Sequence, residues 1–141
     1  MTAHEAAGER ILDPVRQKQV SFGAEEAVRQ KIIAYLTGEV GVPHGLIAVE
    51  RAIDRSANRY RADIIAYERD GKPWMLIECK APEVEITQRA FDQIGAYNRL
   101  IRAPYLLVTN GRRHYCCRWN GETGGPAFLE QFPLYPPREP D

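Results

Sequence analysis

Two stretches of the chain carry apolar residues at helical spacing and predict amphipathic helices. The first begins near Ser21, a candidate N-cap, has two acids in its first turn and ends at Gly38 and Gly41. Its apolar side consists of Val28, Ile32, Tyr35 and Leu36. The second helix is expected over residues 87–102, where apolar side chains again recur on one side. Residues 1–20 show no clear pattern.

Five shorter apolar stretches predict strands. They are residues 45–53, 59–67, 73–80, 104–109 and 112–119. Residues 54–58 form a polar turn, and the dipeptides Asp70-Gly71 and Asn110-Gly111 are signals for two-residue hairpin loops. A strand, helix, strand succession normally makes a parallel crossover. The expected fold is therefore an α/β mixed sheet: a helix, a three-stranded antiparallel meander, a helix, a parallel strand and an antiparallel return strand.

The composition limits the class of protein. A chain of 141 residues suits one domain, assigned to residues 1–132, with a proline-rich extended tail over residues 133–141. No apolar stretch is long enough to span a membrane, and the polar start of the chain lacks an apolar signal core, so we expect a cytoplasmic protein. The three cysteines have no metal-ligand spacing and suggest free thiols.

The charge is balanced overall but distributed unevenly. The chain has 19 basic and 19 acidic residues, which gives no global attraction to nucleic acid. Residues 93–121, however, contain five arginines and no acid. Most of the bases are arginine, which suits bidentate contacts with phosphate, although genome composition could produce the same bias. The sequence thus predicts a neutral protein with one basic face.

The Asp70-Gly71 loop brings two acids together. Counting back from a two-residue loop, Tyr67 faces Trp74 and Asp63 faces Glu78. Alternation along the strand places Lys80 on the same face as Glu78. Two carboxylates and an ammonium group are therefore expected to converge at the end of an otherwise apolar hairpin.

Two partly buried carboxylates this close are unfavourable without a cation between them. Mg²⁺, or Mn²⁺ in its place, bound by Asp63 and Glu78 would relieve the repulsion and could activate a water molecule. Lys80 would then lie beside that water or stabilise the charge of the transition state. The competing interpretation is that Lys80 alone neutralises one carboxylate at a solvated sheet edge.

Two helix positions could add to this group. On a helical wheel Glu25 faces the sheet, whereas Glu26 lies about 100° away. The simpler interpretation of Glu25 is a first-turn acid favoured by the helix dipole, or an ion pair with Arg29. Gln93 and Tyr97 are one turn apart and share a face of the second helix.

These residues carry a family resemblance. Asp63 followed by Glu78-Cys79-Lys80 resembles the PD-(D/E)XK nuclease signature, with Ala62 in place of its proline. Glu25 resembles the first-helix glutamate of that superfamily, and Gln93 and Tyr97 resemble its glutamine-x-x-x-tyrosine motif. More closely, the chain is similar to the N-terminal nuclease domain of type I restriction enzyme R subunits over roughly residues 11–119. The similar stretches are residues 24–29, 77–82, 92–93 and 108–111.

The resemblance implies a restriction-endonuclease-like core and Mg²⁺-dependent cleavage of DNA phosphodiesters. It assigns metal binding to Asp63 and Glu78, catalysis to Lys80, and supporting roles to Glu25 and Gln93. The residues expected to contact DNA are Arg29, Arg59, Arg61, Tyr97, Arg112 and Arg113. The chain has no Gly-x-x-x-x-Gly-Lys-Ser/Thr loop, so an ATP-driven motor or a specificity subunit would be a separate partner. A homodimer is one way to make two cuts in duplex DNA.

Two other hypotheses stay open. The chain could be a nuclease-fold module that binds DNA or a protein partner without cutting. It could also be a structural domain that carries the motif by accident. Calorimetric metal binding that depends on Asp63 would separate the enzyme from both alternatives.

Overall fold

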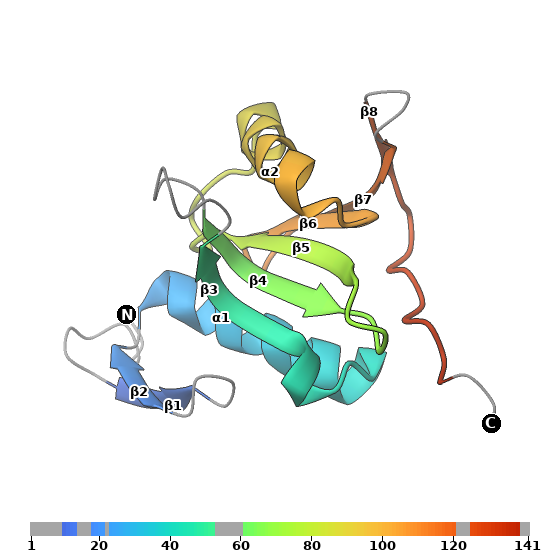
Figure 1. Ribbon diagram of the computed structural model, residues 1–141. Helices are drawn as coiled ribbons and strands as arrows, with labels where there is room; N and C mark the ends of the chain where they lie inside the picture. Colours follow the sequence, from blue (N-terminus) through green and yellow to red (C-terminus); the bar gives the residue numbers. More distant parts are fainter. Residues whose placement is uncertain (1–9, 14–17, 22, 53–60, 121–124, 139–141) are drawn as a thin grey trace.

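A six-stranded sheet lies between two helices in the computed structural model, which describes residues 10–13, 18–21, 23–52, 61–120 and 125–138. Helix α1 (Ala24–Tyr35) covers one face of the sheet and α2 (Gln88–Ile101) covers the other (Figure 1). The strands are β3 (Ile47–Ala52), β4 (Arg61–Tyr67), β5 (Pro73–Cys79), β6 (Tyr105–Thr109), β7 (His114–Asn120) and β8 (Gly125–Phe128). None of the helices in the described parts of the chain is long and apolar enough to cross a membrane.

The strand directions make the sheet mixed. The strands lie side by side in chain order, and every neighbouring pair is antiparallel except β5 and β6, which are parallel. Helix α2 connects these two parallel strands. The expected mixed α/β architecture is therefore confirmed, and β8 is a strand that the apolar pattern did not predict.

The start of the chain differs from the expectation. Strands β1 (Arg10–Asp13) and β2 (Lys18–Ser21) form a separate antiparallel pair, so Ser21 lies in a strand and Gly23 caps α1. Helix α1 continues into a π-helical turn (Leu36–Val40), and it is Gly41, with φ of 89°, that ends it. A short 3₁₀ turn (His44–Leu46) precedes β3. The predicted turn at 54–58 lies outside the described residues.

The hairpin between β4 and β5 has a longer loop than the sequence suggested. Glu68 N–H donates to Lys72 O and Gly71 N–H donates to Glu68 O, which leaves three residues in the loop, with Gly71 at φ of 89°. Tyr67 consequently pairs with Pro73, and the expected pair with Trp74 is wrong. A register shift between Ala66 and Tyr67 then restores the predicted alignment further along.

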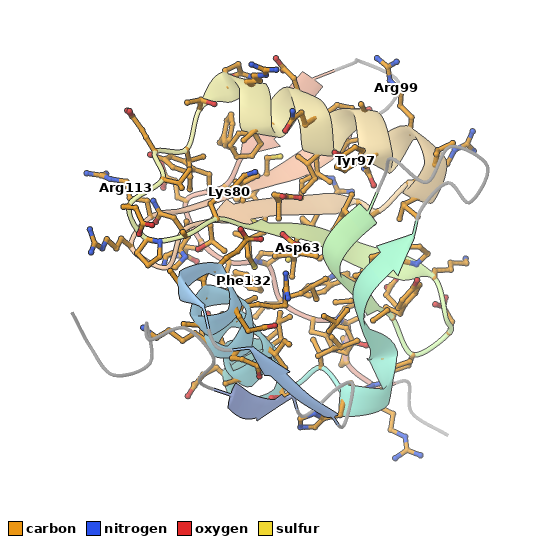
Figure 2. The ribbon with its side chains drawn as sticks, turned by 90° about the vertical axis from the view of Figure 1, so that its left-hand side faces the viewer. Asp63, Lys80, Tyr97, Arg99, Arg113 and Phe132 are labelled. Atoms are coloured by element: carbon orange, nitrogen blue, oxygen red, sulfur yellow. The ribbon has the colours of Figure 1, made fainter. Side chains whose placement is uncertain are left out.

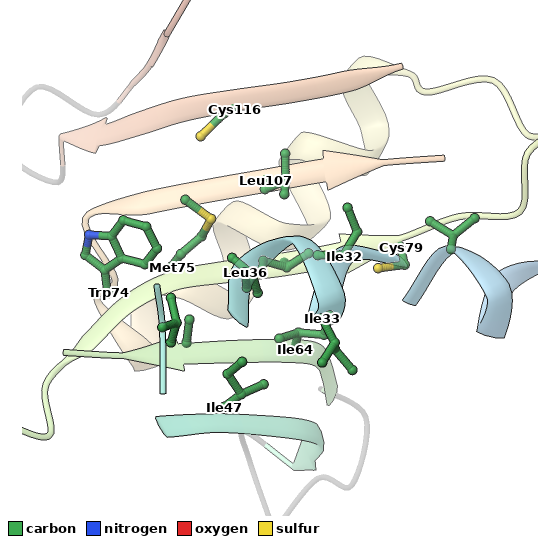
Figure 3. Packing of buried hydrophobic residues seen from close by; sticks show 14 residues of the cluster. Ile32, Ile33, Leu36, Ile47, Ile64, Trp74, Met75, Cys79, Leu107 and Cys116 are labelled. Atoms are coloured by element: carbon green, nitrogen blue, oxygen red, sulfur yellow. The ribbon is translucent and has the colours of Figure 1, made fainter. Parts of the chain in front are cut away.

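The core on the α1 face is built from long aliphatic side chains. Ile32, Ile33 and Leu36 of the helical segment pack over Ile64 and Met75 of the sheet (Figure 3). Strand β5 is buried on both faces because a helix covers each of them, which explains its nearly continuous apolar sequence. Each buried aliphatic or aromatic side chain of this kind contributes about 1.5–3 kcal/mol.

The core on the α2 face depends on a close approach of the helix to the sheet. Phe91 and Ile94 pack against Leu76 and Leu106. At Gly95, a Cβ atom would lie 2.8 Å from the Trp119 ring, so only glycine fits there. This contact sets how near α2 lies to β7.

The C-terminal segment packs on the domain. Residues 129–138 form no helix or strand, as expected of a proline-rich stretch. The rings of Phe132 and Tyr135 nevertheless contact Trp74 edge-on, at centroid distances of 6.2 and 5.0 Å. Tyr135 Oη also donates to Tyr67 O at 2.6 Å. Tyr135, which the sequence placed in the proline-rich tail, therefore packs against the hydrophobic cluster on the α1 face of the sheet.

Candidate active site

The candidate site lies where β4 and β5 separate. Their ladder ends at the pair Ile64 and Ile77, one residue before the expected pair of Asp63 with Glu78. Beyond that point Cys79 N–H donates to Asp63 Oδ2 at 2.7 Å, so a side-chain carboxylate accepts this backbone donor of β5. Asp63 is thereby fixed between the two strands, with its carboxylate only partly exposed.

Glu78 and Lys80 lie on one face of β5, as alternation predicted. Lys80 Nζ is 3.4 Å from Glu78 Oε1, and both side chains are partly buried. Cys79 points to the opposite face and is fully buried. Lys80 N–H donates to Thr109 O at 2.8 Å, so β6 holds the backbone at the end of β5. The pair therefore stands on a rigid part of the sheet.

The electrostatic environment of Glu78 is unfavourable for a bare carboxylate. Burial, and next the negative charge of Asp63, raise the pKa of Glu78 to about 7, while the Lys80 ammonium opposes the shift. At neutral pH this carboxyl is consequently poised between its two protonation states. A cation bound beside it would favour the ionised form and release the proton.

Glu25 joins this group from the first turn of α1. Its pKa is raised by burial and by the charge of Asp63, and it is lowered in part by Arg29 and Lys80. Glu25 also contributes to the raised pKa of Glu78. Glu25 Oε1 and Asp63 Oδ1 lie 3.8 and 3.3 Å from the same Arg29 nitrogen, which places the first turn of α1 beside the end of β4 that carries Asp63. Figure 2 shows Asp63 and Lys80 in the layer between the two helices.

Glu26 is the more buried of the two α1 acids, contrary to the helical-wheel prediction. Its side chain is 10% exposed, against 52% for Glu25. Glu26 accepts a hydrogen bond from Arg29 Nη1 at 3.0 Å and one from Gln30 Nε2 at 3.3 Å. In the first turn of α1, Glu26 thus points into the protein and Glu25 lies at the rim of the site.

Arg29 does not lie where a DNA contact would require. Its side chain is only 8% exposed, and the Nη atoms lie 3.0 Å from Glu26, 3.3 Å from Asp63 and 3.8 Å from Glu25. A guanidinium enclosed by three carboxylates has no face for a phosphate. The expectation that Arg29 contacts DNA is therefore corrected: it belongs to the interior of the acidic site.

The two α2 residues are placed differently. Gln93 is exposed, and within the described residues no hydrogen bond joins it to Lys80. Tyr97 is half-buried and packs against the core on the α2 face of the sheet (Figure 2). Gln93 thus faces solvent, and Tyr97 faces the sheet.

Arg112 and Arg113 lie exposed in the turn between β6 and β7. Asn110 N–H donates to Arg113 O at 3.2 Å, so the two loop residues are Gly111 and Arg112, one position later than the Asn-Gly signal suggested. Figure 2 shows Arg113 at the edge of the molecule. Arg59 lies outside the described residues, and the Arg61 side chain is likewise not among those described.

Asn110, which the sequence indicated only as a turn residue, is buried. Its Oδ1 accepts the N–H groups of Arg112 at 2.9 Å and Arg113 at 2.7 Å. Its Nδ2 donates to Val84 O at 2.8 Å in the loop that follows Lys80. Asn110 therefore joins two loops, which together bound a groove of about 400 Å³. An asparagine before a glycine is typical of such turns, but the bond to Val84 has no sequence signal.

The donor chemistry fits a hard divalent cation. Asp63, Glu78 and Glu25 offer carboxylate oxygens, the ligands that Mg²⁺ prefers. Over the described part of the chain, however, no three His, Cys, Asp or Glu side chains converge in metal-binding geometry. Asp63 and Glu78 are therefore the candidate ligands, and water molecules would complete the coordination.

One comparison with known proteins identifies relatives. Residues 24–133, most of the chain, match the family described as type I restriction enzyme R protein N terminus. No curated protein matches the chain. The matched span begins at the first residue of α1 and includes every residue of the site described above.

Proposed function

The chain belongs to the family of type I restriction enzyme R protein N termini, and on that premise we propose that it is a metal-dependent DNA nuclease domain. Family membership associates the chain with restriction nucleases and with DNA as the substrate. The proposal adds the finer claims: Mg²⁺ as the cofactor, hydrolysis of a phosphodiester bond, and a site formed by Asp63, Glu78 and Lys80.

One observation carries this proposal. Two carboxylates and a lysine from β4 and β5 converge where the strands separate, and Glu25 of α1 adds a third acid. A structural ion pair would need only Glu78 and Lys80. Asp63 contacts Arg29 at 3.3 Å, yet together with burial it still raises the pKa of Glu78, which Lys80 does not fully offset. Ionisable groups whose pKa is shifted by burial and by neighbouring charges are typical of catalytic sites.

Each residue has a role in the proposed reaction. A divalent ion held by Asp63 and Glu78 would neutralise phosphate charge and lower the pKa of a water molecule. The attacking water would give one proton to solvent as its oxygen bonds to phosphorus, the bond from phosphorus to a sugar oxygen would break, and that oxygen would take up a proton from solvent. Lys80 Nζ donates a hydrogen bond to the attacking water or to a phosphate oxygen. Glu25 accepts a hydrogen bond from a water at the rim of the site.

The DNA backbone would approach from the turn between β6 and β7. Arg112 and Arg113 are exposed there, and both backbone N–H groups are held by Asn110. The exposed position of these two arginines suits contacts with phosphates, which position DNA without reading its sequence. Because the chain as a whole carries no net charge, DNA binding would depend on these local phosphate contacts and should weaken strongly with salt.

A plasmid assay tests the proposal. Wild-type protein with Mg²⁺ or Mn²⁺ should convert supercoiled plasmid to nicked or linear forms, and Lys80→Ala should lower the rate by about 10²–10⁴-fold. The matched control is Lys72→Ala, which removes an exposed lysine at the far end of the same hairpin and should leave the rate unchanged. No cleavage by the wild type, or equal cleavage by the wild type and Lys80→Ala, contradicts the proposal.

A second candidate function is a nuclease-fold module that binds DNA without cutting. The observation in its favour is that the described residues contain no group of three converging metal ligands. Calorimetric titration with Mn²⁺ separates the two candidates. Binding that is abolished in Asp63→Ala supports the enzyme, whereas DNA binding without any Mn²⁺ binding supports the module.

A further inference from the structure

We propose that the groove between the loops that follow β5 and β6 binds an unpaired nucleotide of the DNA substrate, with Tyr115 as the stacking surface for its base. The inference rests on the proposed function, because it specifies the form of DNA that the site takes. The groove has a volume of about 400 Å³. It is lined by residues 82–86 of the first loop, by Asn110, Arg112 and Arg113 of the second, and by Tyr115 of β7.

The groove adjoins the end of the candidate site that carries Lys80. Strands β5 and β6 are parallel, so the two loops leave the same edge of the sheet. Ligands of open α/β sheets bind at such carboxyl ends of the strands. Pro82 follows Lys80 by two residues, and Lys80 N–H donates to Thr109 O at 2.8 Å, directly before Asn110. A DNA strand that lies in the groove would therefore lead to Lys80.

The groove is held at a fixed width by the protein itself. Asn110 is buried, and its Nδ2 donates to Val84 O at 2.8 Å in the first loop. Its Oδ1 accepts the N–H groups of Arg112 and Arg113 in the second loop, at 2.9 and 2.7 Å. A site that is formed before the ligand arrives loses less conformational entropy when the ligand binds.

The two loops carry opposite charges. Arg112 and Arg113 are exposed on the second loop, and Glu83 and Glu85 are exposed on the first. A single strand can place its phosphates on the arginine side and its base toward the acids, because the amino groups of bases can donate to carboxylates. A duplex brings a second phosphate backbone, which the acids would repel. The charges of the groove therefore favour one strand over two.

Tyr115 supplies an aromatic surface at this groove. Its side chain is 37% exposed, and it contacts Phe91 edge-on at a centroid distance of 6.2 Å. Phe91 contacts Phe128 edge-on at 5.0 Å, so the tyrosine belongs to a row of packed rings. Stacking on such aromatic side chains is how proteins bind unpaired bases without reading sequence. A base inside a duplex is stacked on its neighbours and cannot use this surface.

Fluorescence anisotropy on the full chain in EDTA, which prevents metal-dependent cleavage, tests the proposal. The probes are a labelled thymidine oligonucleotide, the same strand with abasic sites in place of every base, and the blunt duplex of the thymidine strand with its complement. The wild type should bind the thymidine strand most tightly. Tyr115→Leu should weaken that binding by about 5–150-fold, because stacking is lost, and Tyr115→Phe should retain it. The matched control is Tyr35→Leu, which removes a tyrosine of similar exposure, 42%, outside the groove and should bind as the wild type does.

Each outcome bears on a separate claim. The proposal is overturned if the wild type binds the duplex more tightly than the thymidine strand, or if Tyr115→Leu weakens binding of the thymidine and abasic strands equally or not at all. Each of these results leaves the nuclease proposal standing. No cleavage in the plasmid assay contradicts the nuclease proposal and does not change the anisotropy result. If circular dichroism shows that Tyr115→Leu is unfolded, the wild type decides alone: equal affinities for the thymidine and abasic strands contradict stacking.

Discussion

The two ends of the hairpin formed by β4 and β5 differ in composition: aromatic side chains pack at the turn end, and charged side chains gather at the open end. At the turn end, Trp74 is 2% exposed and three aromatic rings contact it edge-on, while Tyr135 bonds to the backbone at Tyr67. At the open end the strands part, and Asp63, Glu78 and Lys80 fill the gap. At the turn end, burial of the aromatic rings lowers the free energy of the folded state. At the open end, the carboxylates of Asp63 and Glu78 repel each other.

The difference shows how a single hairpin can serve stability and chemistry at once. Edge-on aromatic contacts add about 0.5–1.5 kcal/mol each beyond the burial of their surface. That surplus can offset the repulsion between carboxylates at the other end, where burial and Asp63 raise the pKa of Glu78. Three substitutions test the two ends of the hairpin separately.

The largest effect on stability is expected for Trp74→Ala at the turn end. Removing this ring should lower the free energy of unfolding by about 3–5 kcal/mol, because it leaves a cavity beneath Tyr105, Phe132 and Tyr135. Urea denaturation followed by circular dichroism measures the loss. Leu134→Ala, at a side chain that is 92% exposed, is the control and should change little. A loss as small as that of the control would show that the aromatic end does not stabilise the fold.

The next effect is a pH dependence at the open end. Because the pKa of Glu78 is raised to about 7 in the folded state, the folded chain binds more protons than the unfolded chain between pH 4.5 and 7. Without metal, stability should therefore fall as pH rises through that range, by about 2–3 kcal/mol from this group. Glu78→Gln should remove this part of the decline, which urea denaturation in EDTA at pH 5 and pH 8 would measure.

Two results would bear against that expectation. Unchanged pH dependence in Glu78→Gln would mean that the carboxyl titrates normally. An increase in the wild type's stability relative to Glu78→Gln as pH rises from 5 to 8 would mean that Lys80 outweighs Asp63 and burial. Added Mg²⁺ should reverse the decline in the wild type but not in Glu78→Gln, because the ion favours the ionised carboxylate.

The smallest effect is expected for Asn110→Asp, beside the open end. The aspartate retains an acceptor for the N–H groups of Arg112 and Arg113 but loses the donor to Val84 O. Stability should fall by about 1–3 kcal/mol. DNA affinity, measured by fluorescence anisotropy at several salt concentrations, should fall further than in Asn120→Asp. That control makes the same change at the far end of β7, and equal affinities would exclude a role for the groove in DNA binding.

Local pattern predicted that Lys80 lies beside Glu78 better than it predicted how β4 pairs with β5. The loop between β4 and β5 is one residue longer than expected, yet the register shift near Tyr67 restores the pairing of Ile65 with Leu76. Alternation then places Lys80 with Glu78 correctly. The pairing of Asp63 with Glu78 was not predicted correctly, because the strands separate where charge replaces apolar packing.

The burial of Glu26 and the contact of Arg29 with Asp63 had no local signal. On a helical wheel Arg29 lies one turn beyond Glu25 on the same side of the helix, so only the pair between these two residues could be expected. Its burial follows from the approach of α1 to β4, which brings Asp63 of a distant segment within 3.3 Å. The packing of Tyr135 on Trp74 is a similar case, because a proline-rich stretch carries no periodicity that indicates its partner.

The order of the two helices and of the strands from β3 to β7, the mixed sheet and the approach of Lys80 to Glu78 could be predicted from the sequence. Those features depend on periodicity, turn chemistry and spacing along the chain, which are local properties. Only the folded structure shows which α1 acid is buried, that Arg29 contacts Glu26 and Asp63 inside the protein, and that Asn110 joins two loops. Each of these depends on contacts between segments far apart in the chain, where burial decides whether a charge must find a partner inside the protein.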